Sequence, residues 1–108
     1  MSLTQREVDA YRTDGYLILP PCFQAAELAA LKDEVAKEFV IDSERRVLEK
    51  GGTMVRSVYG CHAENEAFRR LVRDPRLLEP AVQLLGDQAY IYQFKINAKA
   101  AFSGDLWA

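Results

Sequence analysis

The chain has 108 residues, with 14 Lys and Arg against 16 Asp and Glu, a single His and two Cys. At roughly 100–200 residues per domain this is one domain or less, and 49% hydrophobic with 28% charged residues is a globular composition. A net charge of −2 provides no general basic field for nucleic acid or an anionic membrane, and one His with two Cys excludes a four-ligand Cys/His zinc site.

Helical signals begin at the N-terminus. Thr4 can cap a first helix that Gly15 ends. The apolar run Tyr16–Leu19, closed by two prolines, is typical of a short strand. A longer amphipathic helix is predicted from about Gln24 to Val40, because its apolar residues recur at helical spacing.

The middle of the chain is less regular. The charged stretch from Asp42 to Lys50 is predicted to be an irregular connection, and Val55–Tyr59 a short extended segment. Asn65 can start the next helix, which Asp74-Pro75 separates from a further helix that continues to Gly86.

A last strand is predicted from Ala89 to Ala98, because its side chains alternate between two faces. One face is apolar and is expected to be core: Tyr90, Tyr92, Phe94 and Ile96. The other carries a polar row: Gln93, Lys95 and Asn97, preceded by Ile91. Such a row is ordinarily just the solvent-facing side of a strand. Since a lone strand is unstable, Tyr16–Leu19 or Val55–Tyr59 must pair with it.

Several residues have mainly structural interpretations. His62 is expected to lie at the surface or at a helix start rather than to bind metal. Four arginines around Asp74-Pro75 are expected to be solvated helix-end charges rather than an anion site: Arg69, Arg70, Arg73 and Arg76.

The N-terminus shows no signal peptide, and no stretch approaches the ~20 apolar residues that span a bilayer. A disulfide between Cys22 and Cys61 is arithmetically allowed, but nothing marks secretion. A soluble cytoplasmic protein without a membrane or nucleic-acid partner is therefore expected.

Residues 11–20 place Asp14-Gly15-Tyr16 between a helix and a short apolar run, and residues 92–99 precede Phe102-Ser103-Gly104 and Trp107. Together these stretches resemble the phytanoyl-CoA dioxygenase family of non-haem iron, 2-oxoglutarate-dependent oxygenases. The second stretch resembles the strand and loop that precede the iron-binding His-x-Asp in ectoine-hydroxylase-like members.

The resemblance implies an α+β fold in which N-terminal helices pack on the first strands of a double-stranded β-helix, or jelly roll. The barrel would be incomplete, with residues 1–108 forming a single N-terminal portion. The polar row would then face the barrel interior. By resemblance, Gln93 and Asn97 contact 2-oxoglutarate, Trp107 walls the cosubstrate pocket, and Lys95 meets a substrate carboxylate. No catalytic residue and no metal ligand is implied within this chain.

In such relatives a Trp-His-x-Asp-type segment follows directly, whereas this chain stops at Ala108, without the two-His-one-carboxylate triad that holds Fe(II). The expectation is the N-terminal part of an Fe(II)/2-oxoglutarate dioxygenase that hydroxylates a small metabolite, inactive alone and binding neither iron nor cosubstrate stably. The alternative is a non-catalytic binding or assembly module, or a remnant. Its open strand edge would pair with a second copy or with a separate C-terminal half.

Overall fold

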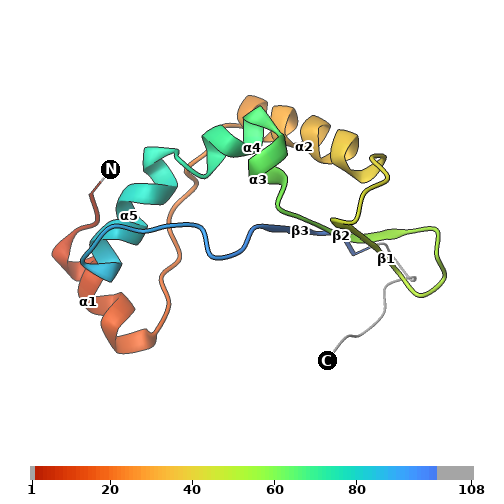
Figure 1. Ribbon diagram of the computed structural model, residues 1–108. Helices are drawn as coiled ribbons and strands as arrows, with labels where there is room; N and C mark the ends of the chain where they lie inside the picture. Colours follow the sequence, from red (N-terminus) through yellow and green to blue (C-terminus); the bar gives the residue numbers. More distant parts are fainter. Residues whose placement is uncertain (1, 100–108) are drawn as a thin grey trace.

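The computed structural model describes residues 2–99 (Figure 1). In chain order the elements are α1 Gln5–Asp14, α2 Ala25–Phe39, β1 Arg46–Leu48, β2 Val55–Tyr59, α3 Cys61–Glu64, α4 Glu66–Leu71, α5 Pro75–Leu85 and β3 Lys95–Asn97. Within this range no helix is long and apolar enough to cross a membrane, and Cys22 and Cys61 are both free thiols.

The predicted helix starts are confirmed by their caps. The Thr4 side chain accepts a hydrogen bond from the Glu7 N–H, and the Glu7 side chain accepts one from the Thr4 N–H, which forms a capping box. Gly15 ends α1 with φ 84°, a left-handed conformation that glycine adopts without a steric penalty. At α4, the Asn65 side chain accepts hydrogen bonds from the N–H groups of Ala67 and Phe68.

The predicted strand at Tyr16–Leu19 is wrong. This stretch connects α1 to α2 without regular structure, and Figure 1 shows it running beside α5, away from the sheet. Tyr16 is 63% exposed and Ile18 82% exposed, so neither side chain buries the apolar surface that would hold a strand in place.

The charged stretch from Asp42 to Lys50, predicted to be irregular, contains β1. This strand pairs antiparallel with β2, with Arg46 opposite Val58 and Val47 opposite Ser57. The charge of Arg46 is accommodated because its guanidinium donates to the Phe39 carbonyl at 3.0 Å.

The sheet has the order β1-β2-β3, and β2 is the confirmed partner of the last strand. That strand is shorter than predicted, because β2 turns into α3 at Gly60, whose N–H makes the final bond to the Phe94 carbonyl. Tyr90 and Tyr92, expected in the core, are 85% and 91% exposed in the described chain, since they precede the paired region.

The core lies between the sheet and the helices α2–α4. Val58, Cys61 and Phe68 are buried at its centre. Around them pack Leu31, Val35, Phe39, Val55, Leu71, Phe94 and Ile96. Phe94 and Ile96 therefore belong to the core as predicted. The helices cover one face of the sheet, as Figure 1 shows.

The molecule is elongated, measuring 47 × 30 × 26 Å, with α1 and α5 at one end and the sheet at the other (Figure 1). Its radius of gyration is 16.3 Å, against about 13 Å for a compact domain of ~100 residues. At the α5 end, the Gln83 side chain holds Leu3, accepting from its N–H at 2.7 Å and donating to its carbonyl at 3.0 Å.

Arg76 links α5 to the start of α2, contrary to the prediction that it is a solvated charge. Its guanidinium donates to both carboxylate oxygens of Glu27, at 2.9 and 2.7 Å, and to both of Asp74, at 2.9 and 2.8 Å. It also donates to the Cys22 carbonyl at 3.0 Å and stacks 4.1 Å from the centre of the Phe23 ring. Hydrogen bonds from Arg76 lower the pKa of Glu27 and the pKa of Asp74, each to about 2.

Replacing Phe68 by Ala is expected to reduce the free energy of unfolding by about 3–5 kcal/mol, because the ring is 3% exposed and its loss leaves a cavity in the core. Urea denaturation of the purified protein measures the change. The control is Ile18→Ala at an exposed position, expected to change the free energy by less than about 0.5 kcal/mol. A loss below about 1 kcal/mol for F68A would show that this cluster is not the core.

The Arg76 network predicts acid sensitivity. A carboxyl group with a pKa lowered by folding stabilises the protein above its unfolded value and loses that contribution as pH falls through its folded value. For Glu27 and Asp74 the loss is therefore expected from their ordinary values of 4.5 and 3.8 down to about 2. Urea denaturation across this range should show a weaker pH dependence for Arg76→Gln than for wild type and Arg12→Gln. Equal slopes for all three proteins would contradict the assignment.

Candidate functional site

The polar row of the last strand lies on the side of the sheet opposite the helices. Val58 and Ile96 are cross-strand partners and both join the core, so their neighbours in sequence point to the other face. Lys95 and Asn97 occupy that face and are exposed. Gln93, also exposed, lies two residues before the strand. Lys95 and Asn97 thus share a face that the helices do not cover.

β2 contributes to the same face. Its register places Tyr59 opposite Lys95 and Ser57 opposite Asn97. The Lys95 ammonium lies 5.7 Å from the centre of the Tyr59 ring, within the range of a cation–π interaction. Neither Tyr59 nor Ser57 was among the predicted site residues. The sequence of β2 has no regular polar–apolar alternation, so only its pairing with β3 places these two residues beside Lys95 and Asn97. Ser57 is buried at this position, with 1% of its surface exposed.

The row consists of hydrogen-bond donors. Two amides flank an ammonium, and within residues 2–99 the side chains of Gln93, Lys95 and Asn97 make no hydrogen bond or ion pair. Amide and ammonium groups donate to carboxylates, and amides do so without adding charge. This donor set fits a carboxylate ligand such as 2-oxoglutarate. Trp107, the fourth predicted site residue, lies outside the described residues.

Iron does not fit the part of the chain that the structure describes. No group of three or more His, Cys, Asp or Glu residues is close enough there to hold a metal ion. The only His in the sequence, His62, stacks on Phe94 with ring centres 5.2 Å apart. The nearby Cys61 thiol is buried, which raises its pKa and opposes the thiolate that a metal requires.

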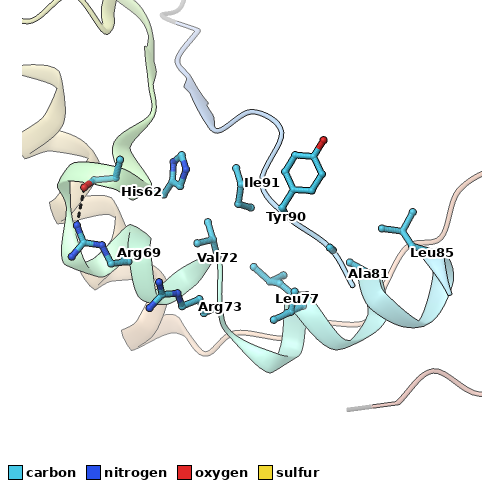
Figure 2. Close-up of a pocket in the computed structure, with 12 residues that line it drawn as sticks. His62, Arg69, Val72, Arg73, Leu77, Ala81, Leu85, Tyr90 and Ile91 are labelled. Atoms are coloured by element: carbon cyan, nitrogen blue, oxygen red, sulfur yellow. Dashed lines mark hydrogen bonds between the residues drawn. The ribbon is translucent and has the colours of Figure 1, made fainter. Parts of the chain in front are cut away.

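A separate pocket of about 690 Å³ lies between α3–α4, α5 and the segment that leads to β3 (Figure 2). Its wall is largely apolar, with Val72, Leu77 and Ile91 among the lining residues. Arg69 stands at its edge but donates to the Ala63 carbonyl at 2.7 Å, an interaction drawn in Figure 2. None of the polar row lines this pocket, so the structure does not combine the two features.

Comparisons with known proteins agree with the fold and with the family that the sequence resembles. The sequence pattern of the family described as Phytanoyl-CoA dioxygenase (PhyH) matches residues 11–107. The chain is 40% identical over 113 aligned residues to the L-proline trans-4-hydroxylase of Streptomyces griseoviridis, covering 99% of this chain and 41% of that protein. It is 36% identical to the ectoine dioxygenase of Bordetella bronchiseptica, covering 95% of this chain and 35% of the relative.

Among solved structures, the crystal structure of EctD from S. alaskensis with bound Fe superposes with a TM-score of 0.81 at 32% identity. The match covers 88% of this chain and 35% of that chain. The same protein has been solved with 2-oxoglutarate and 5-hydroxyectoine, at a TM-score of 0.80 to this chain. The chain spans about a third to two fifths of the length of the relatives it matches. The family match over residues 11–107 and these relatives show that the chain belongs to the phytanoyl-CoA dioxygenase (PhyH) family.

Proposed function

We propose that the protein to which this chain belongs is a non-haem Fe(II)/2-oxoglutarate-dependent dioxygenase that hydroxylates a small metabolite. This chain supplies its N-terminal helices and the first strands of its jelly roll. The observation that carries the proposal is the open donor face of β3, where Lys95 and Asn97 lie opposite the helices in a chain of the PhyH family.

The residues of this face have distinct roles in the proposal. The amides of Gln93 and Asn97 donate hydrogen bonds to 2-oxoglutarate, and Trp107 forms an aromatic wall of the same pocket. Lys95 pairs with a carboxylate of the substrate. The reaction consumes O2: one oxygen atom enters the hydroxylated product, and the other enters succinate as 2-oxoglutarate loses CO2. On the face of the sheet opposite the polar row, the helices pack against the strands and exclude water.

The substrate class follows from the charge of Lys95. The relatives are named for ectoine and L-proline, and both molecules are small and carry one carboxylate. An ammonium on the open face is the complement of that group. We therefore propose a small amino-acid-like substrate whose carboxylate is bound by Lys95.

The iron ligands are proposed to lie outside these 108 residues. A facial triad requires two His and one carboxylate, and this sequence contains one His. His62 is also engaged with Phe94 in the core layer. We therefore propose that the 108 residues alone do not catalyse the reaction. The iron ligands would come from a part of the protein that corresponds to the additional length of the relatives.

The proposal predicts a difference between two protein preparations. The product of the whole encoding reading frame should release succinate from 2-oxoglutarate in the presence of Fe(II) and a substrate such as L-proline or ectoine. The purified 108-residue chain should release none above the level seen without protein. Succinate release by the 108 residues would contradict the proposed division. A reading frame that encodes no further His would favour the assembly-module alternative, which size-exclusion chromatography tests.

Asn97→Ala is expected to raise the KM for 2-oxoglutarate about tenfold or more, because a hydrogen bond to a charged group contributes about 1.5–3 kcal/mol. Succinate release by the whole protein measures this change. Gln88→Ala is the matched control, since Gln88 is exposed and lies outside the polar row. An unchanged KM for N97A would remove Asn97 from the proposed cosubstrate site.

A further inference from the structure

We propose that Tyr59 is a specificity-determining residue, whose ring holds the Lys95 ammonium in place for a substrate carboxylate. This inference rests on the proposed function and deepens it. It proposes that Tyr59 and Lys95, on two neighbouring strands, together make the site prefer a substrate with a carboxylate. Tyr59 has no role in the site predicted from the sequence.

The register of the sheet places Tyr59 next to Lys95. Tyr59 and Lys95 are cross-strand partners, and on one face such partners lie about 4.5–5.5 Å apart at their Cβ atoms. The Lys95 ammonium lies 5.7 Å from the centre of the Tyr59 ring. A cation within about 6 Å of a tyrosine ring is attracted by the negative charge of its face. The ring therefore offers the ammonium a defined resting position.

Hydrogen bonds hold the backbone of Tyr59 in place. Its N–H donates to the Arg45 carbonyl at 2.9 Å, and its own carbonyl accepts from the Arg45 guanidinium at 3.0 Å. The next residue, Gly60, donates its N–H to the Phe94 carbonyl at 2.9 Å. These three bonds join the end of β2 to Arg45, the residue before β1, on one side and to Phe94, the residue before β3, on the other.

The position of the Tyr59 ring beside the Lys95 ammonium has a consequence for substrate recognition. A lysine ammonium sits on a flexible four-carbon stem, and ordering that stem normally opposes binding. Where the ring has already ordered it, a carboxylate meets a positioned charge and the cost of ordering is reduced. An analogue with a neutral amide in place of the carboxylate gains much less from the same ammonium. The Tyr59–Lys95 pair thus favours acids over amides.

Binding of L-proline and of L-prolinamide to the whole protein, measured by calorimetry with 2-oxoglutarate present and oxygen absent, tests this selection. The wild type and Tyr59→Phe, which keeps the ring, are expected to prefer the acid. The preference for the acid is the dissociation constant of L-prolinamide divided by that of L-proline. Tyr59→Leu should lower this ratio about two- to fivefold. Tyr16→Leu, which removes an exposed tyrosine outside the sheet, should leave the ratio unchanged.

Tyr59→Met is a second ring-free variant that keeps the test decisive if Tyr59→Leu does not fold, because its flexible side chain fills a similar space. A ratio in the ring-free variants equal to that of the wild type would overturn the inference. Absence of any acid preference in the wild type would overturn it as well. Succinate release by the wild type is scored separately, so a failure of the proposed function is distinguishable from a failure of this assignment.

Discussion

The packing of Val58 and Ile96 beneath Phe68 determines which side of the last strand can meet a ligand. The two residues are opposite each other on β2 and β3, and both belong to the core that α2–α4 cover. Because side chains alternate along a strand, this burial directs Lys95 and Asn97 to the other face. A shift of one residue in register would place the polar side chains under the helices and the apolar ones outside. The hydrophobic core therefore fixes the position of the candidate site without contacting it.

The alternation of the last strand was readable from the sequence, and it placed Phe94 and Ile96 in the core and the polar row opposite them. The extent of the strand was not readable, because it depends on where β2 ends at Gly60. Tyr90 and Tyr92 fit the same alternation, yet they lie beyond the last pairing bond and are exposed in the described chain. Whether Tyr90 and Tyr92 are buried therefore depends on strand pairing, which is a tertiary property.

Three other differences between prediction and structure also depend on contacts made elsewhere in the fold. The stretch that contains β1 is too charged to be expected as a strand, but Arg46 finds a carbonyl partner at the end of α2, 3.0 Å away. The Tyr16–Leu19 run has the composition of a strand, but no other strand within residues 2–99 pairs with it. Arg76 was placed by composition among solvated charges, although its two carboxylate partners come from positions 2 and 49 residues away in sequence. Asp74 is a local partner, but the contact with Glu27, 49 residues away, leaves no local signal in a single sequence.

Gly60 lies at the junction between the site face and the core, since Tyr59 precedes it and the buried Cys61 follows. Its φ is 66°, and a Cβ built there would meet only Arg45 Cδ, at an ordinary 3.7 Å. Space is therefore available, and the backbone conformation is the obstacle to other residues. Asn and Asp adopt this region more readily than branched side chains do. A directed-evolution library aimed at altering substrate choice would do best to leave this position as glycine, or to admit only Asn and Asp, while varying its neighbours on the open face.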